Sequence, residues 1–215
     1  MKLLAIETST DICSIAYIDD GKTMSIVEEI IPRKHAELLP VYFRELNEIN
    51  KHLMHDISAI AVSIGPGSFT GLRIGLSYAK GLAYSSGLPI IPVPTLMSFV
   101  EGVSGNEKSI RIFLHSHGNI YFEQKIVSGV TAEMKTSEIS VRKWNESLEY
   151  IDLDDTIIEW GCSYYISEMH LKNTVITVQP SAKWIGRLAN KHYKSWIVTE
   201  PYNIVPTYVS PFKLN

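Results

Sequence analysis

The sequence predicts an α/β protein with two similar lobes, each built on a mixed β-sheet. Three observations predict this class. The chain opens with three short segments typical of antiparallel strands, at 2–7, 13–18 and 22–31. Segments of helical periodicity then alternate with apolar strands up to about residue 100. The second half repeats this order, hairpin strands first and helices and strands afterwards, although no repeat is visible residue by residue.

The opening strands lead into a strongly apolar helix. Asp19-Asp20-Gly21 predicts the hairpin between the second and third strands, and Pro32 ends the third. A helix is expected at 35–50, with Pro40 tolerated near its amino end. Its apolar side chains form two stripes, Leu38, Tyr42, Leu46 and Ile49 on one face and Leu39 and Phe43 beside it. This arc is wider than contact with one sheet requires, so we expect part of it to meet another surface.

The stretch from 57 to 100 organises the first lobe, because Arg73 and Lys80 are its only charged residues. It predicts a strand at 57–64, a tight turn at Gly65-Pro66-Gly67, a helix at 68–85 and a second strand before Pro94. Ser68 or Thr70 is the expected helix cap.

A ridge with almost no side chain follows this helix, because Gly71, Gly75, Ala79 and Ala83 recur every four residues. Each glycine inside a helix costs about 1 kcal/mol relative to alanine, so a packing gain is expected in return. One interpretation is that the ridge packs on the protein's own sheet. The other is that it receives a partner chain, which is favoured by apolar residues on the other sides of the helix, Leu72, Ile74, Leu76 and Leu82.

The second half is expected to begin after a helix at 95–103 and a polar break at 104–107, which gives lobes of 1–103 and 108–215. Strands are predicted at 110–114, 120–127, 156–160 and 175–178, with a turn at 118–119. Helices are predicted at 141–150, 163–170 and 181–193, the last with Ile185, Leu188 and Ala189 facing inward. The tail from 199, rich in proline, is expected to be extended.

Composition excludes several classes of protein. The 215 residues, 45% hydrophobic and with a net charge of -3, can bury a sizeable core in one or two domains. No lysine/arginine run is present, so we expect the chain not to grip nucleic acid by itself, although a partner could supply the basic surface. Cys13 and Cys162 stand in no metal or redox spacing and are expected as buried thiols. No export signal or membrane span is visible, which indicates a cytoplasmic protein.

No complete catalytic or cofactor set is visible. The turn at 65–71 lies where phosphate-binding loops lie, but a Walker loop needs glycine and lysine at 70 and 71, and this chain has Thr70 and Gly71. Neither the dinucleotide fingerprint nor the nucleophile elbow fits around Ser68. His115 and His117 could bridge a metal, but no carboxylate or cysteine nearby in the sequence completes a set. Glu7 and Asp11 flank the first turn, but no second phosphate-binding loop accompanies them. We therefore expect no catalytic residue, cofactor or metal in this chain.

Several motifs occur in the order and spacing of one known family. They are Leu4-Ala-Ile-Glu-Thr-Ser-Thr10 with Cys13-Ser14, His35-Ala-Glu-Leu-Leu-Pro40, Gly65-Pro-Gly-Ser-Phe-Thr-Gly-Leu-Arg-Ile-Gly75 with Ala79-Lys-Gly-Leu-Ala83, and Pro94-Thr-Leu96. On these motifs the chain resembles the bacterial TsaB (formerly YeaZ) family, well over residues 2–100 and in outline beyond. The resemblance implies the two-lobed fold of sugar kinases and actin, the ASKHA fold. Two departures lie in the second half, His115-Ser-His117 in place of Asp-Ala-Arg and Tyr208-Val-Ser210 in place of an ending in arginine.

The resemblance also implies a function. Proteins of this family are non-catalytic partners of TsaD, a paralogue that places a threonylcarbamoyl group on the adenosine beside the anticodon in tRNAs reading codons that begin with A. TsaE, an ATPase, joins them, and tRNA is reached only through the complex. The resemblance implies contact with TsaD, or with a second copy of the chain, through the two long helices of the first lobe. The expected partner-binding residues are Leu38, Leu39, Tyr42, Phe43, Leu46, Gly71, Leu72, Gly75, Ala79 and Ala83.

Two other interpretations stay open. The chain could be a stand-alone ATP-binding enzyme of the kinase or ATPase type, or it could simply form a homodimer.

Overall fold

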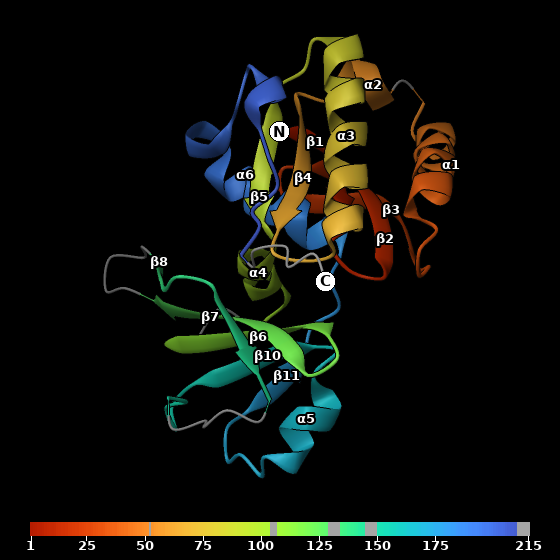
Figure 1. Ribbon diagram of the computed structural model, residues 1–215. Coiled ribbons are helices and arrows are strands. Elements are labelled where there is room, and N and C mark those ends of the chain that lie inside the picture. The colour runs from red at the N-terminus through yellow and green to blue at the C-terminus, as the bar shows by residue number, and fades with distance from the viewer. Residues whose placement is uncertain (52, 104–106, 129–133, 145–149, 210–215) are drawn as a thin grey trace. The chain divides into compact units, whose positions relative to one another are not determined.

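The computed structural model (Figure 1) describes residues 1–51, 53–103, 107–128, 134–144 and 150–209. The chain divides into two compact units. Unit 1 contains Met1–Ser98 and Pro180–Thr207, and unit 2 contains Phe99–Gln179 and the residues from Tyr208 on. This differs from the expected lobes of 1–103 and 108–215, because the segment 180–207 returns to the first unit. A hydrophobic helix face in this segment completes the core of unit 1.

Unit 1 is built on a five-stranded mixed sheet in the order β3-β2-β1-β4-β5. The strands are β1 (Lys2–Glu7), β2 (Ile12–Asp19), β3 (Lys22–Ile30), β4 (Ala59–Gly65) and β5 (Ile90–Pro94). β1, β2 and β3 pair antiparallel, whereas β4 and β5 are parallel to β1, so the predicted opening hairpins are confirmed. Asp20 and Gly21 form the tight turn between β2 and β3, with φ angles of 45° and 76°. Positive φ at both positions matches the right-handed twist of the two strands.

Helices cover both faces of this sheet, as Figure 1 shows. On one face, α1 (His35–Ile49) and α3 (Phe69–Ser86) pack on one set of β1 and β2 side chains, Leu4, Ile6, Ile15 and Tyr17. On the other face, α6 (Ala182–Trp196) packs on the alternate set, Leu3, Ala5, Ala16 and Ile18. Successive residues of a strand point to opposite faces of the sheet. Helices cover both faces, which explains why both sets of side chains are apolar. Ile185, Leu188 and Ala189 of α6 point inward as predicted.

Short helices complete unit 1. They are α2 (Leu53–Asp56), α4 (Thr95–Ser98) and the 3-10 helix η2 (Pro201–Asn203). The helix predicted at 95–103 is divided into two parts. The first part is α4, and the second is a 3-10 turn, η1 (Phe99–Gly102), which is assigned to unit 2. After η2 the backbone of 204–209 has no regular structure. Lys80 of α3 holds this segment by donating to the carbonyl oxygens of Tyr202, at 3.0 Å, and Ile204, at 2.7 Å.

Unit 2 contains a second mixed sheet in the order β11-β10-β6-β7-β8, and β9 also pairs with β7. Its elements are β6 (Ser109–His117), β7 (Ile120–Ser128), β8 (Met134–Thr136), β9 (Ser140–Lys143), β10 (Thr156–Trp160), α5 (Ser163–Glu168) and β11 (Val175–Thr177). β6 and β7 are antiparallel, and β10 and β11 run parallel to β6. Going outward from the first strand, both sheets have the same order and directions. The predicted duplication of an α/β lobe is therefore confirmed.

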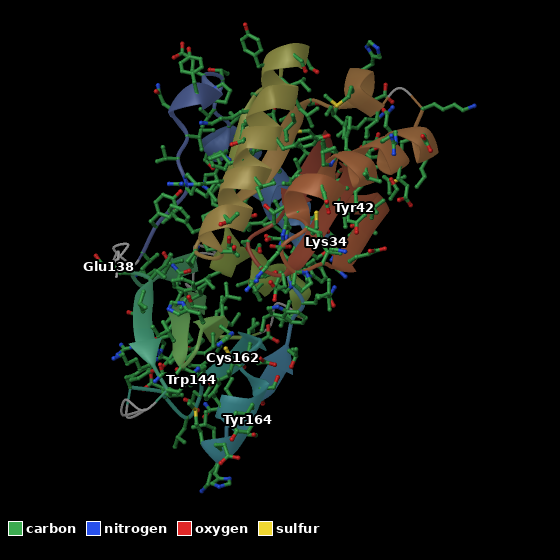
Figure 2. All side chains as sticks on the ribbon, turned by 45° about the vertical axis from the view of Figure 1, so that its right-hand side comes forward. Lys34, Tyr42, Glu138, Trp144, Cys162 and Tyr164 are labelled. Atoms are coloured by element: carbon green, nitrogen blue, oxygen red, sulfur yellow. The ribbon has the colours of Figure 1, made fainter. Side chains whose placement is uncertain are left out.

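The predicted helix at 141–150 is wrong at its start, where the chain forms β9, and 145–149 lie outside the described residues. Val141 pairs with Phe122 of β7 across the sheet. Trp144, labelled in Figure 2, stacks on Tyr121 with ring centroids 3.9 Å apart and on Tyr165 at 5.0 Å. Pairing with β7 and this aromatic stack outweigh the weak local helical pattern.

A buried ion network joins the strands of unit 2. Arg111 of β6 contacts Glu123 of β7 and donates from Nε to Asp155 at 2.8 Å, and it donates to the Tyr150 carbonyl at 2.8 Å. Burial alone would raise the pKa of Asp155, but hydrogen bonds from Ser109, Arg111 and Lys125 outweigh it and hold this pKa below its usual value. The network therefore keeps charged groups satisfied inside the unit.

Candidate partner-binding surface

The loop from β4 to α3 is fixed against the turn between β1 and β2. Ser68 caps α3, since its Oγ accepts from the amide of Gly71 at 3.2 Å. The amide of Ser68 donates to the carbonyl oxygen of Ser9 at 2.7 Å. Free amides at a helix start are what a phosphate would bind, and here these two already have partners within unit 1. This geometry uses the loop for internal docking.

The two glycines that begin the bare ridge pack against Thr8. The Thr8 hydroxyl donates to the carbonyl oxygen of Gly71 at 2.8 Å. A Cβ placed at Gly71 would overlap the Thr8 carbonyl oxygen, and one placed at Gly75 would overlap the Thr8 hydroxyl. The helix backbone can come this close to the turn only where side chains are missing. The contact with Thr8 is therefore the packing gain that offsets the cost of two helical glycines.

The bare ridge consequently faces the protein's own core, which was one of the two interpretations of the sequence. Of the ten residues expected to bind a partner, only Leu38 and Phe43 are half-buried. The other eight are buried in unit 1: Leu39, Tyr42, Leu46, Gly71, Leu72, Gly75, Ala79 and Ala83. Tyr42, labelled on α1 in Figure 2, donates its hydroxyl to Glu29 of β3 at 2.8 Å. These eight residues hold α1 and α3 to the sheet, and none of them forms an outer surface.

The outer side of the same two helices still presents apolar groups. We call it the α1–α3 surface and define it by the half-buried Leu38, Phe43, Ile74, Tyr78 and Leu82 and the exposed Val41, Ile49 and Tyr84. Phe43 and Tyr78 bridge the two helices edge to face, with ring centroids 6.0 Å apart. Ile49 is 59% exposed and Tyr84 is 91% exposed. Large apolar side chains exposed to this degree on neighbouring helices are typical of an interaction surface.

A second row of small residues lies on the outer side of α3. Ser77, Gly81 and Ser85 are exposed and spaced four residues apart. A Cβ placed at Gly81 would meet nothing within 4 Å, in contrast to Gly71 and Gly75. No contact among the described residues explains this helical glycine. Sequence reasoning missed this row because it is shorter than the inner one and has a single glycine.

Glu7 is a buried carboxyl beside the first turn. It is fully buried, its Oε1 accepts from the amide of Ser9, and burial raises its pKa to about 7. The side chains of Ser9 and Ser63 lower this pKa by hydrogen bonding to the carboxyl, but burial outweighs them. Asp11, the other acid of this turn, is exposed. The two carboxyls that flank the turn are thus in different environments and do not form an acid–base pair.

The candidate metal ligands do not gather into a site. His115 stacks on Tyr165, and its Nε2 lies 3.0 Å from the Gly118 carbonyl oxygen, whereas His117 contacts Ser116. Within the described ranges, no three His, Cys, Asp or Glu side chains are placed to hold a metal. Cys13 and Cys162 are free and buried, as expected, and burial raises the pKa of both thiols. None of the described helices has the length and apolar character needed to span a membrane.

Comparison with known proteins points to one biosynthetic system. Residues 19–122 match the family "TsaD: tRNA N6-adenosine threonylcarbamoyltransferase". The chain is 38% identical to the tRNA threonylcarbamoyladenosine biosynthesis protein TsaB of Escherichia coli K12 over 112 residues, 52% of this chain and 48% of that protein. It is 25% identical to TsaB of Haemophilus influenzae over 97% of this chain and 93% of that protein. In the first alignment the chain therefore spans about half the length of its relative, and in the second nearly all of it.

Solved structures agree with this result at the level of the fold. YeaZ from Pseudomonas aeruginosa matches with a TM-score of 0.81 and 24% identity, over 97% of this chain and 99% of that one. The ethanolamine utilization protein EutJ from Carboxydothermus hydrogenoformans matches with a TM-score of 0.53 and 10% identity, over 87% and 90%. The predicted sugar-kinase/actin-like fold is confirmed. The chain is therefore similar to TsaB proteins in sequence over almost its whole length, and it shares the fold of YeaZ.

Proposed function

We propose that this chain is a non-catalytic, activating subunit of the tRNA threonylcarbamoyladenosine machinery and that it binds a TsaD-like transferase through the α1–α3 surface. The observation that supports the surface is the set of apolar residues on the same helix as the outer small row of Ser77, Gly81 and Ser85, which are the exposed Tyr84 and the half-buried Ile74, Tyr78 and Leu82. Small residues let a second helix approach closely, and the aromatic rings beside them supply area to bury. The match of one chain to both TsaB proteins and the TsaD family model supports a pairing of paralogues.

The non-catalytic part of the proposal rests on the loop at the start of α3. The amide of Ser68 is used by Ser9, and the amide of Gly71 by the Ser68 side chain. A phosphate at this place would have to displace both hydrogen bonds and the contact with Thr8. The activity then belongs to the transferase, whose competent conformation this subunit stabilises by binding it more tightly than the alternative. A TsaE-like ATPase joins this complex in the cytoplasm. In the absence of TsaD, two copies of the chain pair through the same α1–α3 surface.

The experiment is co-purification with TsaD from the same organism, followed by titration calorimetry. Ser77→Trp and Gly81→Leu place bulk on the outer row of α3 and should abolish the complex, while neither variant unfolds at a lower temperature than the parent protein. Ser195→Trp is the matched control, because Ser195 is exposed on α6, on the other face of the sheet. Binding that survives both α3 substitutions contradicts the surface, and no binding by the parent chain contradicts the partner.

A second titration separates the proposal from a stand-alone enzyme. Adding ATP and magnesium to the isolated chain should give no heat of binding. Micromolar affinity for ATP would contradict the non-catalytic assignment.

A further inference from the structure

Helix α6 carries basic residues on its outward face only. Lys183, Arg187, Lys191 and Lys194 follow one another at intervals of four, four and three residues, which places them on one side of a helix. The opposite side is the buried one, where Ile185, Leu188 and Ala189 meet the sheet. The helix contains no aspartate or glutamate. Its solvent side is therefore a positive strip about 16 Å long, from the helical rise of 1.5 Å per residue.

An aromatic ring is built into this strip. The ammonium of Lys183 lies 4.4 Å from the ring centre of Trp184, and the guanidinium of Arg187 lies 4.9 Å from it. Trp184 is half-buried and so keeps some exposure to solvent beside the two cations. Cations held on an aromatic ring lose less freedom when they meet an anion.

The acidic side chains on the strands beneath α6 already have partners. Glu28 of β3 accepts from the hydroxyl of Ser14 at 2.7 Å, and Ser14 in turn accepts from the amide of Ala182 at 2.9 Å. Asp19 and Asp20 contact the amino group of Met1. The acidic side chains beside the positive strip therefore already contact other groups of unit 1.

We infer that the outward face of α6 binds the phosphate backbone of RNA, so that this subunit contributes directly to holding the tRNA. The inference rests on the proposed function for the identity of the RNA, and on the strip itself for the contact. α6 and the α1–α3 surface cover opposite faces of one sheet, so occupation of one leaves the other accessible. Lysine and arginine contacts to phosphates supply most of the affinity that does not depend on sequence.

RNA fits this face better than a lipid surface does. An amphipathic helix that binds a membrane buries its apolar side in the bilayer, but the apolar side of α6 is already buried against β1 and β2. The face left over is charged, with a single tryptophan. The chain as a whole has a net charge of -3, so a local strip is needed for any attraction to a polyanion.

The test measures binding of an unmodified tRNA transcript by fluorescence anisotropy, at salt concentrations from 50 to 200 mM. It uses the isolated chain and its complex with TsaD. The variant Arg187→Gln/Lys191→Gln/Lys194→Gln removes three charges and leaves the buried face intact. Each lost phosphate contact lowers the slope of log affinity against log salt by about 0.7 to 0.9, so the slope should fall by about 2 to 3. The matched control, Lys108→Gln/Lys135→Gln/Lys172→Gln, removes the same charge from exposed positions of unit 2 and should keep the slope.

Three results overturn the inference. They are an unchanged slope in the α6 variant, an equal loss in the control variant, and loss of binding to vesicles of phosphatidylcholine and phosphatidylserine with no change in binding to tRNA. The proposed function fails separately, through loss of co-purification with TsaD, because the tRNA titration of the isolated chain does not depend on that partner.

Discussion

The backbone of α3 at Gly75 lies directly against the side chain of Thr8, whose Cβ would be 3.4 Å from a Cβ at that glycine and whose hydroxyl would be closer still. The two residues are 67 positions apart in the sequence and come from the first turn and the longest helix of unit 1. Their contact fixes the distance between α3 and the ends of β1 and β2.

This relationship predicts opposite effects for the same substitution at two glycines of one helix. Gly75→Ala should destabilise unit 1 by about 1 to 3 kcal/mol, because the new methyl group overlaps Thr8. Gly81→Ala should stabilise the protein by up to about 1 kcal/mol, since its Cβ enters open space and alanine favours the helix. Urea unfolding of both variants tests this, and equal stabilities would contradict the close packing at Thr8.

A second prediction concerns Glu7 and pH. The pKa of this carboxyl is about 7 in the folded protein and 4.5 as an ordinary glutamate, so the folded state binds the proton more tightly. Its contribution to stability is therefore complete below pH 4.5 and is lost as the pH rises to 7. Glu7→Gln should match the parent protein at pH 4.5 and exceed its free energy of unfolding at pH 8.5 by about 3 kcal/mol, from 1.36 kcal/mol per pKa unit.

The measurement is urea unfolding of both proteins at pH 4.5, 7 and 8.5. Only the difference between them is informative, because the other carboxyls titrate in both. A difference that does not change with pH would show that Glu7 is not buried as a neutral acid.

A third prediction concerns the ion network of unit 2. Arg111→Met leaves the carboxyls of Glu123 and Asp155 buried without their shared cation and should cost about 3 to 5 kcal/mol. Arg142→Met is the control, since Arg142 is one-third exposed and pairs with Glu123 alone among the acids that the structure describes, and it should cost less than about 1 kcal/mol. Thermal unfolding followed by tryptophan fluorescence compares them, and similar losses would mean that burial does not decide the energetics of this network.

A fourth prediction concerns the segment after η2. Lys80→Met removes the ammonium that binds the carbonyl oxygens of Tyr202 and Ile204. The backbone amide hydrogens of residues 202–207 should then exchange with solvent about tenfold faster, which corresponds to ~1.4 kcal/mol. The amide of Thr207 itself donates to the carbonyl oxygen of Ile64 at 2.7 Å. Lys22→Met is the control. Unchanged exchange in the Lys80 variant would assign the anchoring of this segment to Thr207.

The sequence predicts local features of unit 1 well because they depend on neighbours. Asp20 and Gly21 can form the hairpin turn because both tolerate positive φ, and Ser68 caps α3 because its hydroxyl reaches an amide three residues ahead. The direction of the glycine ridge could not be predicted. It depends on Thr8, which only the folded sheet brings to Gly71 and Gly75.

Two other features depended on contacts or spacing that local analysis overlooks. The strand at 140–143 is stabilised by β7 and by the stack of Trp144 on Tyr121, so its local pattern is a poor guide. The basic residues of the α6 strip are separated by other residues, so they form no continuous run in the sequence. Basic residues recur instead at intervals of four, at Lys183, Arg187 and Lys191, which is the spacing of one side of a helix.

The division of unit 1 into 1–98 and 180–207 has a consequence for how the protein is made. On the ribosome, the first five strands emerge well before α6, so Leu3, Ala5, Ala16 and Ile18 stay uncovered while the intervening 81 residues are synthesised. A fragment ending near residue 100 would leave this hydrophobic face of the sheet permanently exposed and should aggregate. A shortened gene that joins Ser98 to Pro180 through a brief linker is the better starting point for producing unit 1 alone.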